Sequence, residues 1–129
     1  MPNCQGINLV SANLQSATLT TSGTFILRNV DFSGADLRWA YLHNVDLSQA
    51  NLKNADLSDI GLSMVYLNGA DLGNANLSNA QMYGVFLNGA NLRGANLDGA
   101  RLEGALYDDQ TTWPDGFDPS LTKAKHISK

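Results

Sequence analysis

An apolar residue recurs at every fifth position along most of this chain, and a smaller apolar residue lies two positions before it. The stretch 88–106, NGANLRGANLDGARLEGAL, shows the unit plainly. Five residues turn an α-helix by about 140°, so an α-helix would bury no single face of this pattern. An unbroken strand would point every second leucine outward, because five is an odd number. Each unit is therefore predicted to be a short extended edge followed by a corner.

The five-residue register runs without a gap through 17 consecutive units. The central residues, mostly Leu, occupy every fifth position of 27–107, and the smaller residues, mostly Ala and Val, occupy every fifth position of 25–105. Because the two positions lie two residues apart, their side chains point to the same side of an extended edge. Both sets are predicted to fill one continuous core.

The second residue after each central position has the composition of a tight turn. Of these 16 corner residues, 12 are Gly or Asn. Both tolerate the positive φ that the third position of a type II turn requires. Four corners differ, and another turn type is predicted for them: Trp39, Gln49, Asp59 and Met64.

A second, longer period overlies the first and spans four of the five-residue units. The segment LNGADLGNANL at 67–77 recurs as LNGANLRGANL at 87–97, and Val45, Val65 and Val85 keep the same spacing. Residues that stack in a solenoid share environments, so the period predicts a coil of four edges. Neighbouring coils are expected ~4.8 Å apart, the spacing of paired strands.

One domain, 1–129, is predicted, and its N-terminal end departs from the main register. Three units within 1–24 fit the pattern in a shifted frame, and the segment 20–24, TTSGT, carries three extra residues. We expect a bulge there, with Gly23 as its turn residue. The first three units either stack as an opening coil or splay away from the solenoid.

The uninterrupted repeats, 25–107, are followed by a segment of different composition, 108–129, which is predicted to be a C-terminal cap and tail. An open solenoid end exposes apolar side chains and unpaired strand groups, so it needs a cover. Trp113 and Phe117 are the large apolar residues available for this cap. The core residues expected beneath Trp113 are Leu92, Leu97 and Leu102.

Two further features of the last segment bear on its structure. Asp118 and Pro119 suit the N-cap and the first residue of a short helix. The basic end, 123–129, is expected to be frayed.

The unit A-(N/D)-L-x-(G/N) resembles the repeat of the pentapeptide-repeat family over about residues 7–107. The resemblance implies an all-β fold, namely a right-handed, four-sided (quadrilateral) parallel β-helix solenoid of about five coils. It implies no particular activity. Compact members of the family are abundant in cyanobacteria, which implies a bacterial cytoplasm.

Composition narrows the possible partners and cofactors. The net charge is −4 and the pI is about 4.8, which argues against a protein that binds nucleic acid through its phosphates. Cys4 is the only cysteine, so no internal disulfide and no cysteine metal cluster are expected. The N-terminus lacks the pattern of a secretory signal, and no apolar run approaches the length of a membrane span. No membrane contact and a cytoplasmic location are therefore expected.

The residue types and spacings do not indicate an enzyme. We find no nucleophile–base pair, metal-ligand set or phosphate loop, so no catalytic, metal or cofactor-binding residue is predicted. His43 is expected on an outward position and His126 in the tail. Asp108 and Asp109 could hold a cation, but two adjacent acids in a loop are more often solvated. The Asn and Asp residues before the central positions are predicted to form hydrogen-bonding walls.

The predicted function is that of a structural or protein-interaction scaffold, with one alternative that the family resemblance implies. Some pentapeptide-repeat proteins resemble DNA in shape and charge and bind type II topoisomerases, so the chain could be a DNA mimic that inhibits gyrase. Such mimicry needs a long, strongly negative rod, whereas the units within 25–107 carry eight acids and five bases. The weak field favours the scaffold.

One of the four outer columns of the predicted solenoid is apolar. The residues just before the central positions stack in columns that should point to solvent, and an apolar column on a polar rod is typical of a contact surface. We expect it to bind an unknown protein partner or a second copy, unless a terminal segment covers it or it is ordinary surface scatter. The column contains Ile26, Asp46, Tyr66, Phe86 and Leu106, with Met64 and Tyr83 beside it and Tyr41 nearby.

Overall fold

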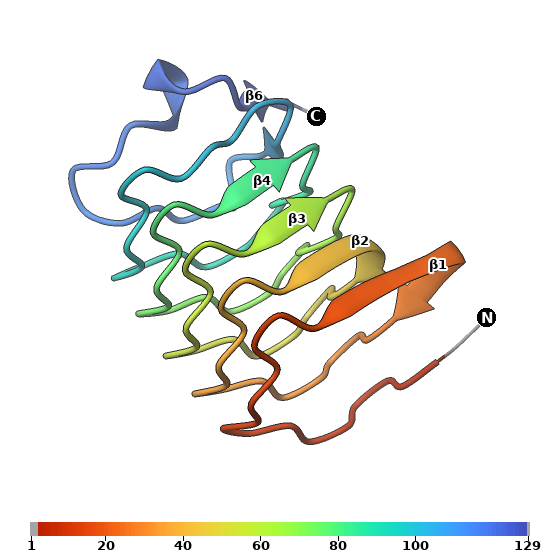
Figure 1. Ribbon diagram of the computed structural model, residues 1–129. Coiled ribbons are helices and arrows are strands. Elements are labelled where there is room, and N and C mark those ends of the chain that lie inside the picture. The colour runs from red at the N-terminus through yellow and green to blue at the C-terminus, as the bar shows by residue number, and fades with distance from the viewer. Residues whose placement is uncertain (1–2, 129) are drawn as a thin grey trace.

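The chain winds into a parallel β-solenoid of about five turns in the computed structural model, which describes residues 3–128 (Figure 1). One wall of the solenoid is a parallel sheet in the order β1-β2-β3-β4, and a second pair, β5 and β6, lies near the C-terminal end. The only helix in the described chain is a single 3₁₀ turn, η1. The elements are β1 Thr18–Ile26, β2 Tyr41–Asp46, β3 Gly61–Ser63, β4 Gln81–Tyr83, β5 Leu106–Tyr107, η1 Pro119–Leu121 and β6 Lys125–His126.

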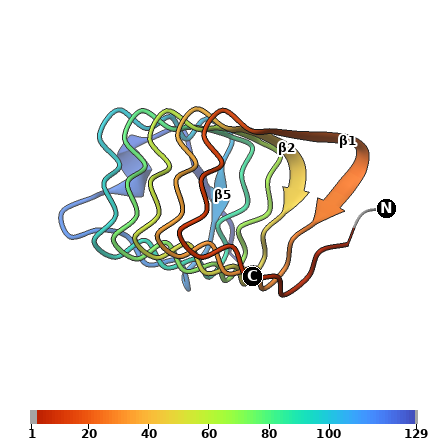
Figure 2. The same ribbon diagram turned by 60° about the horizontal axis from the view of Figure 1, so that its bottom comes forward.

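The predicted coil of four units is confirmed by the strand register. Asp31 pairs with Asn51, which pairs in turn with Asp71, so each step along this column advances the chain by four units. One coil has four positions that directly precede a central residue, and each of them belongs to its own column of paired residues. The coil therefore has four sides. The successive coils lie side by side in both views of the ribbon (Figures 1 and 2).

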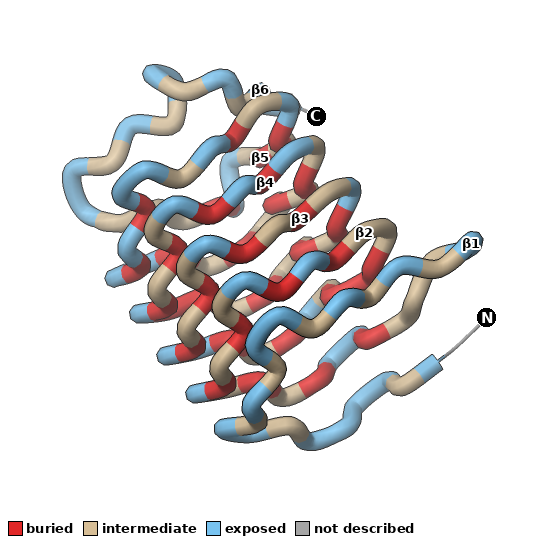
Figure 3. The backbone as a smooth tube through the Cα atoms, viewed as in Figure 1, coloured by how far each residue is buried: buried red, intermediate tan, exposed pale blue. Residues whose placement is uncertain are grey.

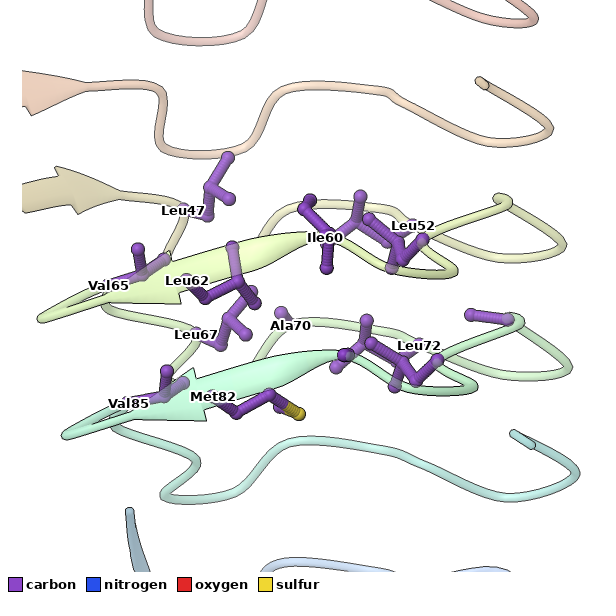
Figure 4. Close-up of a cluster of buried hydrophobic side chains, with 14 of the residues drawn as sticks. Leu47, Leu52, Ile60, Leu62, Val65, Leu67, Ala70, Leu72, Met82 and Val85 are labelled. Atoms are coloured by element: carbon purple, nitrogen blue, oxygen red, sulfur yellow. The ribbon is translucent and has the colours of Figure 1, made fainter. Parts of the chain in front are cut away.

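The predicted core is confirmed as one continuous stack of inward side chains. All 17 central residues are buried, and among the smaller residues only Phe25 and Ala100 are half-buried instead. The buried positions line the inside of every coil after the first (Figure 3). Like side chains stack on like, with Val65 over Val85 and Leu62 over Met82 (Figure 4). Each coil therefore completes the core of its neighbours.

All 16 corner residues adopt a positive φ, including the four that lack Gly or Asn. Their φ values are 61° at Trp39, 61° at Gln49, 57° at Asp59 and 56° at Met64. At Trp39, Gln49 and Asp59 the turn is also closed by the usual hydrogen bond from the next inward residue to the central carbonyl. The prediction of another turn type is therefore wrong at these three corners, and Met64 shares their left-handed backbone. Hydrogen bonds to the coils on either side fix the corner geometry whatever side chain occupies it.

The first coil stacks on the second, which answers the question that the shifted frame left open. Asn8 pairs with Asp31 and Asn13 with Asp36, a longer step than the one that separates the later coils. The three extra residues are absorbed in β1, where the register with β2 shifts between Thr20 and Phe25. Gly23 lies within this bulge, but its φ is not left-handed, unlike that of the later corner residues. The chain thus turns from one wall to the next within the long strand β1 (Figure 1).

The chain continues along the solenoid for one more edge beyond the last repeat. Thr112 pairs with Asn91, and the next residue, Trp113, packs half-buried against the core. The Trp113 ring stacks on Phe117 with 5.1 Å between centroids and meets Tyr107 edge-on at 5.3 Å. The aromatic cap thus begins at the position where the next central residue would stand.

The tail is more ordered than its composition suggests. Asp118 caps η1 as predicted, and its side chain accepts a hydrogen bond from the Ser120 amide. The expectation of a frayed basic end is wrong for β6, which pairs in parallel with β5. Pairing with a strand far away in the sequence supplies the order that the local sequence does not. The last residue, Lys129, lies outside the described residues. Within residues 3–128, no helix has the length and hydropathy that a membrane span needs.

Candidate interaction surface

The predicted apolar stripe exists as a column on one wall of the solenoid. Asp46, Tyr66, Phe86 and Leu106 pair consecutively, and Ile26 precedes them. The rings of Tyr66 and Phe86 stack with 4.7 Å between centroids and 6° between planes. Because neighbouring coils are spaced for ring stacking, each side chain shields the next, and the apolar members of the column are half-buried.

Four further large apolar side chains are exposed on the adjoining side, around the corner from this column. Trp39 is 53% exposed, Met64 45%, Tyr41 43% and Tyr83 37%. Together with the column, they form a surface that spans two adjacent walls. We call this surface the apolar face, and its members are Ile26, Trp39, Tyr41, Met64, Tyr66, Tyr83, Phe86 and Leu106.

Glycines in the adjacent coil let two of these side chains lie flat on the wall. A Cβ atom at Gly61 would lie 2.8 Å from Cδ1 of Tyr41, and one at Gly84 would lie 3.0 Å from Sδ of Met64. The Tyr41 ring is also nearly parallel to the ring of His43, with 6.5 Å between centroids. The solenoid therefore presents Tyr41 and Met64 as flat contact area rather than as free-standing side chains.

Trp39 is the member that sequence reasoning missed. The corner pattern marks it only as an exception, although a tryptophan where Gly or Asn usually stands is itself a signal. The Arg38 guanidinium lies 5.2 Å from the centre of the Trp39 ring. A large aromatic residue in a left-handed conformation costs about 1–2 kcal/mol, and such costs cluster at functional positions.

An ion pair interrupts the column between Ile26 and Tyr66. Arg28 Nε lies 2.6 Å from Oδ2 of Asp46, whose side chain is only 7% exposed. Burial alone would raise the pKa of Asp46, but hydrogen bonds from Ser48 and Arg28 outweigh it and hold the pKa below its usual range. The carboxylate therefore stays charged and paired, and a shallow groove lined by Ile26, Asp46 and Tyr66 runs over it.

Neither described terminal segment lies across the apolar face. Asn3 pairs with Ile26 at one end of the column, and Lys125 pairs with Leu106 at the other. Both segments thus extend the wall edge to edge. The alternative that a terminus folds over the column does not hold for residues 3–128.

The remaining two walls are hydrogen-bonding walls, as the Asn and Asp columns predicted. Asp31 accepts from the amide of Ser33 at 3.0 Å, and Asp36 accepts from the amide of Arg38 at 3.2 Å. The Arg38 guanidinium also binds Asp36 and lowers the pKa of that carboxyl to about 2. These acids serve the backbone and their ion pairs.

The titratable residues considered at the sequence level do not converge on a reactive site. His126 Nε2 contacts Asp109 Oδ1 at 2.7 Å on the surface of the tail. Asp108 accepts instead from the amides of Gly89 and Gln110, each at 3.0 Å. In the part of the chain that the structure describes, no three His, Cys, Asp or Glu residues lie close enough to hold a metal ion.

The repeat and the solenoid place the chain among known proteins. The family model for pentapeptide repeats matches residues 27–59 and 70–106 with eight copies. The chain therefore belongs to the pentapeptide repeat family. No match was found among curated proteins.

Three solved structures of cyanobacterial pentapeptide repeat proteins are similar to this chain. HetL from Nostoc sp. strain PCC 7120, described as involved in heterocyst differentiation regulation, is 30% identical over 87% of this chain and 62% of its own, with a TM-score of 0.61. A second Nostoc PCC 7120 protein is 38% identical over 93% of this chain and 84% of its own, with a TM-score of 0.45. Rfr23 from Cyanothece 51142 is 28% identical over 86% and 90%, also with a TM-score of 0.45.

Proposed function

We propose that the protein is a non-catalytic scaffold that binds another protein through the apolar face. The observation that carries the proposal is the segregation of side chains among the four walls. Two adjacent walls display aromatic residues and Met64, and the other two display Asn and Asp that serve the backbone. An apolar patch bordered by polar walls is typical of a protein contact site.

The chemistry of the face suits protein recognition. Tyr, Trp and Met are enriched where proteins meet, because they bury much area with few rotatable bonds or adapt to irregular partners. The underlying sheet β1-β2-β3-β4 is held by stacked coils, so Tyr41 and Met64 are ordered before a partner arrives. Such preorganisation lowers the entropic cost of binding.

Charge pairing disfavours the alternative of DNA mimicry. Arg28 pairs with Asp46, and Arg38 lies between Asp36 and Asp56. Lys53 also lies 3.5 Å from Asp71. These bases offset much of the negative field that a DNA mimic would present to a topoisomerase. A gyrase supercoiling assay separates the two functions, because a scaffold should leave supercoiling unchanged and a mimic should inhibit it.

The test of the scaffold function replaces the stacked pair by Tyr66→Ser with Phe86→Ser. Both side chains are half-buried outside the core, so the solenoid should still fold. The matched control is Arg93→Ser with Asp98→Ser, two exposed residues on the polar walls whose removal leaves the net charge unchanged.

Each protein is immobilised and incubated with extract of the native cell, and the retained proteins are identified. We expect a partner that wild type and control retain and the Tyr66/Phe86 variant loses at least tenfold. If all three proteins retain the same set in equal amounts, the apolar face is not the binding surface.

A further inference from the structure

The first coil is hydrogen-bonded on one side only. The amides of Leu9 and Leu14 donate to the carbonyls of Asp31 and Asp36 in the second coil at 2.7 and 2.8 Å. The intervening peptide groups face the opposite way, because extended backbone alternates its hydrogen-bonding direction. Among residues 3–128, the N–H and C=O groups of Asn8 and Asn13 make no backbone hydrogen bond. We call this rim the open edge and define it by Asn8 and Asn13.

Within residues 3–128, no segment covers the apolar floor of the first coil, which is formed by Ile7, Leu9 and Leu14. Ile7 occupies the same inward position as Val30 one coil further on, yet Ile7 is 37% exposed and Val30 is fully buried. Leu9 and Leu14 are likewise half-buried, whereas Phe32 next to them is 2% exposed. The first coil is tan and pale blue where the later coils are red inside (Figure 3). Among the described residues, the core therefore reaches the first coil without a covering segment.

The open edge carries no charge. The first charged side chain of the sequence is Arg28, so the whole first coil consists of apolar and neutral polar residues. Exposed strand edges in monomeric proteins are usually protected by lysine, proline or inward-pointing charge. Nothing in the first coil repels a second strand, although the protein carries a net charge of −4.

We propose that two copies of this chain associate head to head through the open edge. A two-fold axis across the edge sets the two first coils antiparallel, so each free N–H meets a free C=O and the two apolar floors cover each other. The opposite end carries the Trp113 and Phe117 cap, which prevents head-to-tail stacking. An isologous contact of this kind closes at two copies and forms no filament.

The proposal concerns a different surface from the apolar face, so the two can fail separately. Ile7→Lys places a charge in the floor, and Asn8→Pro replaces the free N–H of the edge by a ring that blocks strand pairing. The Asn8 amide makes no backbone hydrogen bond within the described chain, so this second variant keeps the backbone ladder of the monomer and removes only the bond from the Val10 amide to Oδ1 of Asn8. Gln81→Lys, which adds the same charge to an exposed position on β4, is the control.

The mass of each 129-residue protein is measured by multi-angle light scattering over a concentration series, with far-UV circular dichroism to verify folding. We expect wild type and Gln81→Lys to reach twice 13.8 kDa and the two edge variants to remain at the monomer mass. A wild type that stays monomeric throughout overturns the proposal, as do edge variants that dimerise like wild type. A dimer lost only on Tyr66→Ser with Phe86→Ser would also overturn it and would assign self-association to the apolar face.

Discussion

The two ends of the solenoid differ in how their apolar core and strand edges are covered. At the C-terminal end, Trp113 and Phe117 cover the last coil and β6 adds a paired strand with basic residues. At the N-terminal end, the edge of the first coil is uncharged and its floor is half-buried. The C-terminal end is covered by a segment outside the repeat, whereas the N-terminal end is formed by three repeat units themselves. The difference between the ends therefore comes from the cap segment and from the uncharged composition of the first coil.

The largest loss of stability is expected from removing the C-terminal cap. Deletion of 108–129 exposes Leu92, Leu97 and Leu102 and should lower the free energy of unfolding by about 3–5 kcal/mol, the range for losing a large aromatic residue. The truncated protein should elute as aggregates or as end-to-end oligomers in size-exclusion chromatography. A monodisperse truncation with an unchanged urea midpoint would show that the cap does not stabilise the solenoid.

Core substitutions should destabilise the protein more in the middle of the stack than at the open end, because side chains in the middle are more deeply buried. Leu67 is 1% exposed, so Leu67→Ala should cost about 2–5 kcal/mol through lost burial and the cavity left behind. Leu14 is half-buried in the first coil, so Leu14→Ala should cost only about 1 kcal/mol. Urea unfolding of both variants measures the difference. Equal costs would mean that the first coil is as well covered as the centre.

Glycine substitutions separate the regular corners from the bulge near the open end. Gly104 has φ +72° and room for a Cβ atom, so Gly104→Ala should cost about 1–2 kcal/mol through backbone strain alone. Gly23 is not left-handed and has no heavy atom within 4 Å of a Cβ atom. Gly23→Ala should therefore be neutral or stabilise by about 0.5 kcal/mol. Thermal unfolding tests the pair, and a Gly23→Ala cost as large as that of Gly104→Ala would contradict the assigned geometry.

The smallest effect on stability is expected at low pH, at a contact between the first two coils. Asp36 has a folded pKa of about 2, set first by its hydrogen bond to the Arg38 side chain, and Gln15 of the first coil also donates to it at 2.7 Å. Because this pKa lies below the unfolded value of about 4, the stabilisation is complete above pH 4 and is lost as the pH falls towards 2. Asp36→Asn should show a shallower loss of urea stability over that window, and parallel profiles would contradict the assignment.

The sequence contained most of the fold because the repeat is local and redundant. A period of five with Leu and Ala at fixed places specifies the core, and the recurrence at every fourth unit specifies four walls. The left-handed backbone of Trp39 was missed because stacking bonds override the preference of a single residue. The order of β6 was missed for a related reason, since it depends on pairing with β5, which precedes the whole cap segment in the sequence.

The candidate surface was only partly accessible from the sequence. The column of Tyr66 and Phe86 follows from the coil length, so it could be read from the spacing. The exposure of Tyr41 and Met64 depends on Gly61 and Gly84 in the next coil, and the one-sided bonding of the first coil depends on its actual stacking. Both are properties of neighbouring coils, which a one-dimensional pattern does not contain.

Amide hydrogen exchange at two protein concentrations tests the difference between the two ends most directly. The account predicts that peptides covering Asn8 and Asn13 exchange quickly in dilute protein and become protected at least tenfold in concentrated protein, where the open edge is docked. Peptides around Leu67 and β6 should exchange equally at both concentrations. Exchange of the first coil that does not change with concentration, or protection that develops instead at the capped end, would contradict the account.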